Sequence, residues 1–441
     1  MRKSVAVLLM FIILLTGAMP VFADNTPNIA SEAAVLIDVS NGRVLFDKNA
    51  DKVMYPASTT KIMTALLALE AVDRGEITLD TVLTYSESAD ATMAIDGSGI
   101  ALKVGEQMTL KNLLEGLMIA SGNDAAACIA EGVSGTIDAF VAKMNQRALE
   151  LGLKNTHFVN PCGLQDKEHY TTANELAKLA TVAMKNATFR SIVECAHIYL
   201  PETNMSEKRY YINTNNLVSR MRYPYYFYEK ATGIKTGSTN DAGHCLVSSA
   251  EDKGKSVIAV VLKAGGVSDS HTDSKALLEY GLKSYAITGI VAKDESVREV
   301  RVKQASDGTD HIVVAAKESL EVMLGKDEKK EEIQMKLNVP DSVRAPIEEG
   351  QVIGSVTYMY KGQALGTVDL ISTEKVKRHF LGFLMSFGEW LWGFRTVKVV
   401  VFTVLGGALA FIILVVVGFI RAVRKSKRKK RRTSRYTPPR Y

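Results

Sequence analysis

The chain has 441 residues, of which 47% are hydrophobic and 23% charged, and this composition excludes a disordered or collagen-like protein. Its length allows about three domains of ordinary size. The net charge is +6, but removing the eleven Lys and Arg of 421–441 and the two at positions 2 and 3 leaves −7 for residues 4–420. A mildly acidic body does not indicate a nucleic-acid-binding domain, and we expect no nucleic-acid partner.

Cysteine and histidine usage excludes two further classes of protein. Four Cys in a chain of this length do not make a disulfide framework, and we assign no disulfide. The seven His include no His-Glu-x-x-His, and the Cys form no Cys-x-x-Cys pair. The spacing of metal ligands is therefore absent, and the sequence predicts no metal site.

Residues 1–23 are typical of a cleavable signal peptide. Two basic residues at positions 2 and 3 precede an apolar run over 5–15, and Val21 and Ala23 stand at −3 and −1 of a cut after Ala23. The run is too short to span a membrane, although an uncleaved anchor is the alternative.

The next segment predicts short strands followed by helices. Two strands over 33–39 and 43–46 are joined by a Ser-Asn-Gly turn. A helix is predicted to open at or near Ser58 and to run to about Val72, and it is apolar on most faces and therefore central. Further helices are predicted over 110–118, 123–131 and 136–151, and from a Thr172-x-x-Glu175 capping box to about 184.

From residue 234 the pattern changes to strands. The ranges 234–239, 244–250 and 256–263 predict an antiparallel meander, and 274–285 predicts a helix. Helices packed on an antiparallel sheet make one large α+β domain over 29–288. A small all-β domain is predicted over 295–372, with strands at 297–303, 311–315, 333–339, 351–360 and 364–370.

Residues 399–420 predict a single transmembrane helix. They are 22 residues without a charge, about 33 Å as a helix, which matches the hydrocarbon core. A buried soluble helix is the alternative, but such helices are rarely apolar all round. By the positive-inside rule the basic tail, 421–441, is cytoplasmic and the rest extracytoplasmic at the cell membrane. We expect the tail to set topology and to meet anionic lipid, with nucleic-acid binding the weaker alternative.

Residues 376–396 predict an amphipathic juxtamembrane segment. Both Trp of the chain, Trp390 and Trp392, stand here among several Phe. Aromatic side chains at this density beside a span are typical of the membrane interface. The alternative is the start of a longer, tilted helix.

Ser58 and Lys61 are the first candidate catalytic pair. Three residues apart at a helix start, they share one face. A lysine can take the serine proton if burial lowers its pKa, and the apolar residues that follow can provide that burial. Alone the motif is weak, because Ser-x-x-Lys recurs at Ser372 and Ser426, and an N-cap serine with an exposed lysine is the ordinary alternative.

Two further motifs strengthen this interpretation. Ser121-Gly122-Asn123 lies between two predicted helices, where a hydroxyl and an amide can project from a tight loop. Lys235-Thr236-Gly237 lies in a predicted strand at a sheet edge, which can accept an extended peptide. Its Lys and Thr can hold a carboxylate, and Gly237 lets a substrate approach. The ordinary alternatives are a helix–helix turn and a solvated strand lysine.

In this order and setting, the three motifs resemble those of the penicillin-recognising serine acyltransferases. Longer stretches look like the serine D-alanyl-D-alanine carboxypeptidases of the penicillin-binding protein 5 type over about 30–370. These stretches are 56–65, 121–126, 160–164 with 169–173, and 233–239. The resemblance implies a β-lactamase/transpeptidase-like catalytic domain, a β-rich domain after it, and a membrane anchor.

The resemblance also implies a reaction. The substrate would be a peptidoglycan stem pentapeptide that ends in D-Ala-D-Ala. Ser58 would attack between the two D-alanines with neutral Lys61 as base, and Ser121 would relay a proton to the leaving amine. Water would then hydrolyse the acyl-enzyme. β-Lactam antibiotics would acylate Ser58 as inhibitors, and this chemistry needs no cofactor.

The binding residues follow in the same way. Asn123 would bind the substrate amide, and Lys235 and Thr236, next to Gly237, would orient the terminal carboxylate. The backbone N–H of Ser238, with that of the nucleophile, would form the oxyanion hole.

Three other functions compete with this interpretation. A serine β-lactamase shares the motifs but would not usually carry a second β-domain and a span. A DD-endopeptidase that cuts cross-links would use the same residues. A non-catalytic wall-associated scaffold would be signalled by loss of the catalytic residues, and all are present. Cys162 lies in a loop expected near the substrate, either as a reactive thiol or as an ordinary loop residue.

Overall fold

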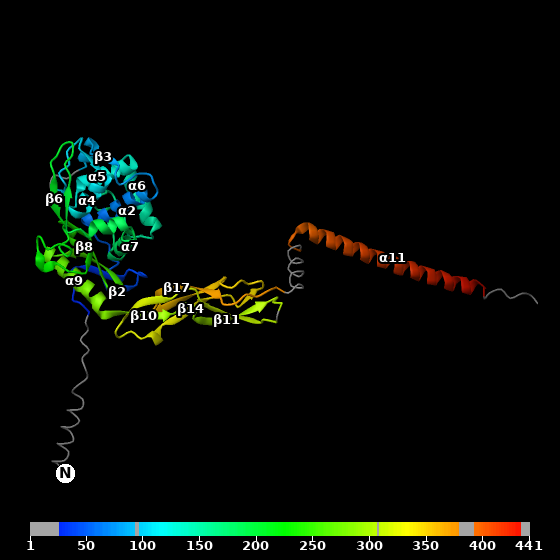
Figure 1. Ribbon diagram of the computed structural model, residues 1–441. Helices are drawn as coiled ribbons and strands as arrows, with labels where there is room; N and C mark the ends of the chain where they lie inside the picture. Colours follow the sequence, from blue (N-terminus) through cyan, green and yellow to red (C-terminus); the bar gives the residue numbers. More distant parts are fainter. Residues whose placement is uncertain (1–25, 93–96, 307, 379–391, 434–441) are drawn as a thin grey trace, which may run out of the picture. The chain divides into compact units, whose positions relative to one another are not determined.

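The computed structural model describes residues 26–92, 97–306, 308–378 and 392–433 (Figure 1). The predicted signal peptide lies outside these residues. The chain divides into two compact units, and each is described by itself. The first contains the chain up to Val291 with 319–336 and 357–367, and the second contains 292–318, 337–356 and the chain from Val368 onward.

A five-stranded antiparallel sheet forms the centre of the first unit. Its strands, in order across the sheet, are β2 (Val44–Lys48), β1 (Ala33–Asp38), β9 (Lys255–Ala264), β8 (Gly243–Asp252) and β7 (Ala231–Thr239). The last three form the predicted meander. Strand β7 is at the edge of the sheet, as the sequence predicts for the strand that carries Lys235.

Helices cover both faces of this sheet (Figure 1). They are α2 (Lys61–Asp73), α4 (Leu110–Ile119), α5 (Asn123–Ser134), α6 (Ile137–Glu150) and α7 (Ala173–Ala183) on one face, and α9 (Val267–Ser284) on the other. Because side chains alternate along a strand, β1 serves both cores. Val35 packs with the larger helical cluster, whereas Leu36 packs with α9, and both are fully buried.

The predicted central helix is present, but it begins later than expected. Ser58 lies in a 3₁₀ turn, η1 (Ala57–Thr60), and Lys61 is the first residue of α2. The N–H and hydroxyl of Thr59 both donate to the carbonyl of Pro56, which closes a tight turn before the regular helix starts. Ten of the thirteen residues of α2 are buried, which confirms its central position.

The predicted capping box is half present. Thr172 is the N-cap of α7, and its hydroxyl accepts from the Glu175 N–H at 3.2 Å. The Glu175 carboxylate does not return to Thr172 but accepts from the N–H of Asn155 at 2.9 Å and from the hydroxyl of Thr156. The carboxylate therefore ties the preceding loop to this helix.

Several elements were not predicted. Helix α9 begins at Val267, seven residues before the predicted start, directly after Gly265 and Gly266. The hairpin of β5 (His197–Leu200) and β6 (Arg209–Ile212) was missed, as was α8 (Ala187–Val193). Both hairpin strands are only four residues long, too short for a period-2 pattern to stand out.

Residues 285–372 form mainly β-strands, in agreement with the predicted β-rich domain. In the first unit, β10 (Tyr285–Val291) pairs antiparallel with β13 (Leu320–Gly325). A six-stranded sheet has the order β14 (Gln334–Asn338), β16 (Val352–Tyr360), β17 (Gln363–Ser372), β12 (His311–Ala316), β11 (Ser296–Lys303) and β15 (Ser342–Arg344). Strands β10, β13 and β15 were not predicted.

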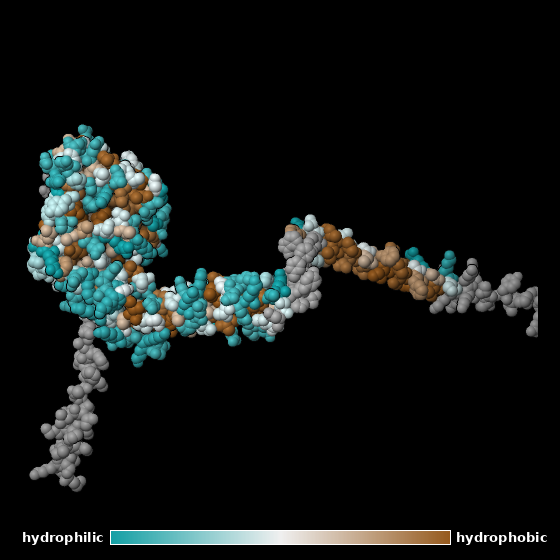
Figure 2. All heavy atoms as spheres, viewed as in Figure 1, coloured by the Kyte–Doolittle hydropathy of each residue, from teal (hydrophilic) through white to brown (hydrophobic). Residues whose placement is uncertain are grey.

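A long apolar helix, α11 (Arg395–Thr433), follows. Within its stretch Lys398–Ser426, a window of 18 residues has a mean hydropathy of 3.0 and none of it is buried, and Figure 2 shows the apolar surface along the helix. In the described part of the chain, no other individual helix is long and apolar enough to cross a membrane. Helices α5 and α6 reach the required length and hydropathy only when they are taken together, and they are bent by 86° relative to each other. Most of the predicted juxtamembrane segment lies outside the described residues.

Candidate active site

The amine of Lys61 is the centre of the site. It is fully buried, and its Nζ lies 2.8 Å from Ser58 Oγ, 2.7 Å from Asn123 Oδ1 and 2.8 Å from the Cys162 carbonyl oxygen. Two of the three predicted motifs, and a loop that the sequence places near the substrate, therefore meet at one nitrogen atom.

Burial changes the chemistry of this amine. A low-dielectric surrounding disfavours the ammonium form, and it lowers the pKa of Lys61 from 10.5 to about 8, against a weaker opposing effect of nearby Cys162 and Asp124. Lys235 is also fully buried, and burial, with the nearby charge of Lys61, holds its pKa well below 10.5. The neutral form of Lys61 is thus accessible near neutral pH.

The loop between α4 and α5 supplies Ser121 and Asn123. Ser121 adopts a left-handed φ of 65°, and α5 begins at Asn123. Both side chains are almost completely buried, at 6% and 5% exposure. The backbone N–H of Asn123 donates to the Ser98 carbonyl at 2.8 Å, so the loop around Ser98 helps to fix the position of Asn123.

Strand β7 places its motif against the turn that carries Ser58. A Cβ on Gly237 would lie 2.9 Å from the Pro56 carbonyl oxygen and 3.0 Å from the Ser58 nitrogen. The lack of a side chain at Gly237 therefore makes room for the turn that carries Ser58. We had expected it to make room for a substrate. Thr236 Oγ1 donates to Thr214 Oγ1 at 2.7 Å, and Ser238 is exposed near the strand end.

The loop 160–164 holds the Cys162 carbonyl in place. Asn160 Oδ1 accepts from the N–H groups of Cys162, Gly163 and Leu164 at 3.2, 2.7 and 3.1 Å. The Cys162 thiol is 2% exposed, and burial raises its pKa. A buried thiol with a raised pKa is a poor nucleophile, so the ordinary interpretation of Cys162 is the better one.

His169 supports the turn that carries Ser58, a role that the sequence did not reveal. Its Nδ1 accepts from the Val159 N–H at 3.2 Å, which leaves the proton on Nε2 to donate to Thr60 Oγ1 at 2.8 Å. Burial lowers the pKa of His169 to about 4, so the ring is neutral at physiological pH. The ring packs edge-on against Phe158.

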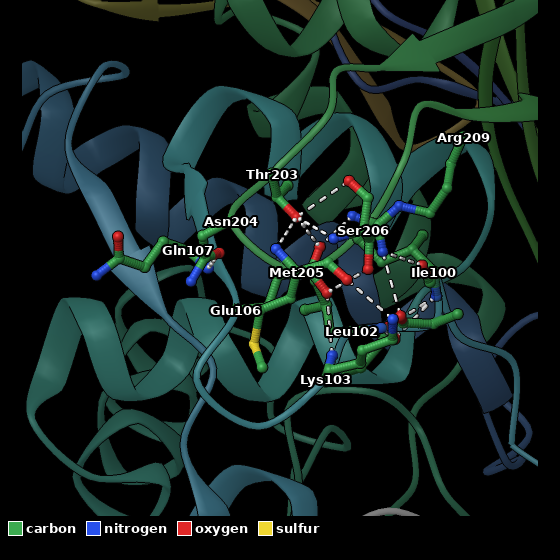
Figure 3. Close-up of polar contacts among 12 residues, drawn as sticks. Ile100, Leu102, Lys103, Glu106, Gln107, Thr203, Asn204, Met205, Ser206 and Arg209 are labelled. Atoms are coloured by element: carbon green, nitrogen blue, oxygen red, sulfur yellow. Dashed lines mark hydrogen bonds and ion pairs between the residues drawn. The ribbon is translucent and has the colours of Figure 1, made fainter.

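A buried ion pair between Glu106 and Arg209 anchors the loop around Ile100 (Figure 3). Glu106 is buried and accepts from Arg209 of β6, from Thr203 Oγ1 at 2.8 Å and from the Lys103 N–H. Burial alone would raise the pKa of Glu106, but these hydrogen bonds and the guanidinium charge leave it lowered. The same guanidinium donates to the Ile100 carbonyl at 2.8 Å.

This ion pair connects to the active site through the loop backbone. The N–H of Ile100 donates to Asp124, the residue after Asn123, at 2.9 Å, and the N–H of Leu102 donates to the same carboxylate. Glu106 and Arg209 stand 103 residues apart, so no local pattern could have paired them. They are positioning residues for the Asn123 side of the site.

A turn with Ser58 beside the buried Lys61, a Ser-x-Asn loop and an edge strand with Lys-Thr-Gly are the features of a serine peptidase of the penicillin-recognising kind. The family model described as D-alanyl-D-alanine carboxypeptidase matches residues 20–266, and the model described as penicillin-binding protein 5, C-terminal domain, matches 285–378. The chain belongs to the D-alanyl-D-alanine carboxypeptidase family. It is a serine carboxypeptidase that acts on peptidoglycan and binds β-lactams.

Individual relatives agree with this assignment. The chain is 35% identical over 398 residues to D-alanyl-D-alanine carboxypeptidase DacF of Bacillus subtilis, covering 88% of this chain and 99% of that protein. It is 30% identical over 380 residues to DacA of Haemophilus influenzae, covering 86% and 92%. Penicillin-binding protein 5 of Haemophilus influenzae has a solved structure that is similar with a TM-score of 0.67 and 27% identity, over 80% of this chain and 99% of that chain.

We predict that Gly163→Ala inactivates the site. Gly163 has a φ of 87°, and an added Cβ would lie 1.9 Å from the Ala57 carbonyl oxygen, so the turn before Ser58 must move. A shift of about 1 Å can cost roughly 100-fold in rate. The rate of acylation by a fluorescent penicillin measures this loss. Gly152→Ala is the matched control, because Gly152 also has a positive φ, 71°, but open space around it; equal rates in the two variants would contradict the prediction.

We predict that Glu106→Gln destabilises the protein by about 3 kcal/mol, because it leaves the Arg209 guanidinium buried without its counter-charge. The side chains are 0% and 13% exposed. Denaturant unfolding of the full chain in detergent measures the loss. Glu279→Gln is the control, since the Glu279–Lys283 pair is on the surface of α9 and should change stability by less than about 0.5 kcal/mol. Similar unfolding midpoints for both variants would show that the buried pair does not stabilise the loop.

Proposed function

We propose that Ser58 is the nucleophile and Lys61 the base of a DD-carboxypeptidase that removes the terminal D-Ala from peptidoglycan stem pentapeptides. The observation that carries the proposal is the set of three partners around the Lys61 amine. A neutral amine has two N–H groups and one lone pair. Asn123 Oδ1 and the Cys162 carbonyl can only accept, so they take the two N–H groups, and the lone pair is left facing the Ser58 hydroxyl.

The chemical steps follow from this arrangement. Ser58 Oγ forms a bond to the carbonyl carbon between the two D-alanines while its proton passes to Lys61. The C–N bond then breaks, and the amine of the leaving D-Ala receives a proton through Ser121. Water adds to the acyl-enzyme and releases Ser58 and the shortened peptide. The N–H groups of Ser58 and Ser238 stabilise the oxyanion in both halves.

The same geometry supports the proposed binding roles. Asn123 uses Oδ1 for Lys61, which leaves its NH₂ group available for the substrate carbonyl. Strand β7 offers an open edge for an extended peptide, and Lys235 and Thr236, beside Gly237, lie on it. We assign the terminal carboxylate to Lys235 and Thr236, with Thr214 orienting the Thr236 hydroxyl.

The direct test is release of D-Ala from a diacyl-Lys-D-Ala-D-Ala tripeptide by the full chain in detergent. We expect prompt release by the natural protein and none by Ser58→Ala. Labelling of Ser58 by a fluorescent penicillin without D-Ala release would favour a DD-endopeptidase that cuts cross-links. Neither release nor labelling by the folded protein would leave the non-catalytic scaffold as the better account.

The acylation rate should rise with pH. The proton-free amine is the reactive form, so the second-order rate constant with a chromogenic β-lactam should increase through a midpoint at pH about 8 and then level off. At two pH units below the midpoint the rate should be roughly 100-fold lower. Lys61→Arg is the control, because a guanidinium does not lose its proton in this range. A rate that is constant between pH 6 and pH 9 would exclude Lys61 as the base.

We further propose the following organisation of the chain: a signal peptide over 1–23, a catalytic domain over 29–288, a β-rich domain over 295–372, a juxtamembrane segment over 376–396, a membrane span over 399–420 and a cytoplasmic tail over 421–441. The apolar surface of α11 and the eleven basic residues of 421–441 support a single-pass protein of the cell membrane with an extracytoplasmic catalytic domain.

Cys195 gives a direct test of this topology, because it is exposed whereas the other three cysteines are buried. A membrane-impermeant maleimide should label Cys195 in intact protoplasts. A Cys195→Ser, Ser434→Cys protein should be labelled only after the membrane is permeabilised. Labelling of the tail cysteine in intact protoplasts would show that the orientation is the reverse of the proposed one.

A further inference from the structure

Exposed aromatic side chains and one methionine make a stripe on the first unit. The stripe lies on the outward face of the β5–β6 hairpin and on the segment around the 3₁₀ turn η2 (Pro224–Tyr226). Its members are His197, Tyr199, Tyr210, Met221, Tyr223 and Tyr225, all of them exposed.

The members of this stripe contact one another along its length. The Tyr199 and Tyr210 rings are 4.8 Å apart, and the His197 ring is 5.5 Å from Tyr210. The Tyr210 hydroxyl lies 3.2 Å from the Met221 sulfur, which joins the hairpin to the η2 segment. There the Tyr223 and Tyr225 rings are 5.9 Å apart. The side chains thus form two contacting groups, which adjoin along the chain because Met221 is two residues before Tyr223.

Folding does not require aromatic residues on this face. Strand alternation turns Ile198 and Leu200 inward, where they are buried, and Arg209 faces the Glu106 cluster on the same side. The outward Tyr199 is 67% exposed, and Tyr225 is 66% exposed. A contiguous exposed patch of this kind marks a binding surface, and tyrosine is enriched in such surfaces.

The stripe flanks the segment that reaches the active site. Tyr210 is four residues before Thr214, about 13 Å along an extended chain, and Thr214 bonds to Thr236 of the catalytic strand. On the other side, Tyr226 packs on His271 at 5.1 Å, and His271 accepts from the Asn216 N–H. A short segment therefore joins the stripe to strand β7, and this places the stripe within reach of a polymer held at that strand.

We infer that the stripe binds the glycan strand of peptidoglycan. The inference rests on the carboxypeptidase function, because the stem peptide that enters the site is covalently attached to that strand. An amino-sugar ring has a C–H face that stacks on an aromatic ring, and a polar rim of hydroxyl and acetamido groups. Tyrosine matches both, with an apolar ring and a hydroxyl at its edge. A row of tyrosines offers successive stacking positions to successive sugars.

The test separates glycan binding from catalysis. The full chain with Ser58→Ala, in detergent, is titrated with glycan chains from which an amidase has removed every stem peptide. We expect Tyr199→Ser and Tyr225→Ser each to weaken binding at least fivefold, and the double variant more. Leu149→Ser is the control, since Leu149 is 69% exposed on α6, outside the stripe, and should leave binding unchanged.

Activity supplies the second measurement. In the Ser58 protein, the tyrosine variants should release D-Ala from the soluble tripeptide within twofold of the natural rate, and from polymeric peptidoglycan at least fivefold more slowly. Equal binding of stripped glycan by all variants would overturn the inference. The stripe would then bind another partner, such as a membrane surface. Failure of the natural protein to cleave the tripeptide would instead overturn the assigned activity, while the glycan titration would still decide the stripe.

Discussion

The active site depends on keeping one lysine amine out of water. Burial makes the charged form of Lys61 unfavourable, and this moves its pKa into the range where it can act as a base. The surroundings are not apolar throughout, because Asn123 Oδ1 and the Cys162 carbonyl accept two hydrogen bonds. With these two hydrogen bonds the buried amine avoids the energetic cost of a polar group without a partner. The same bonds orient the amine toward Ser58.

Holding that amine requires three separate parts of the chain to be fixed independently. The turn at Ala57–Thr60 is fixed by Pro56 and by His169, the carbonyl of Cys162 by the amide of Asn160, and Asn123 by the loop around Ser98. Each uses backbone groups and neutral or paired side chains. These contacts therefore fix the three parts without placing an added net charge beside Lys61, which would shift its pKa.

The sequence was sufficient for what depends on local pattern. The strands of the meander, the apolar α2 and the apolar helix α11 follow from periodicity and composition, and the motif residues are recognisable from their types and spacing. Contacts between distant parts of the chain could not be predicted. Glu106 meets Arg209 across 103 residues, and the Glu175 carboxylate binds Asn155 rather than its own N-cap. Gly237 could be recognised as a position of close approach, but not which backbone approaches it.

The β5–β6 hairpin shows how one short element can serve the site in two ways. Its period of two sends Arg209 inward to Glu106 and the loop that holds Asn123, whereas Tyr210, the next residue, faces outward in the aromatic stripe. A shift of one residue in the pairing would exchange these faces and remove both features. The ion pair within the fold therefore fixes the register that presents the tyrosines. Through this register, the position of the loop that holds Asn123 and the proposed binding of the glycan depend on the same strand pairing.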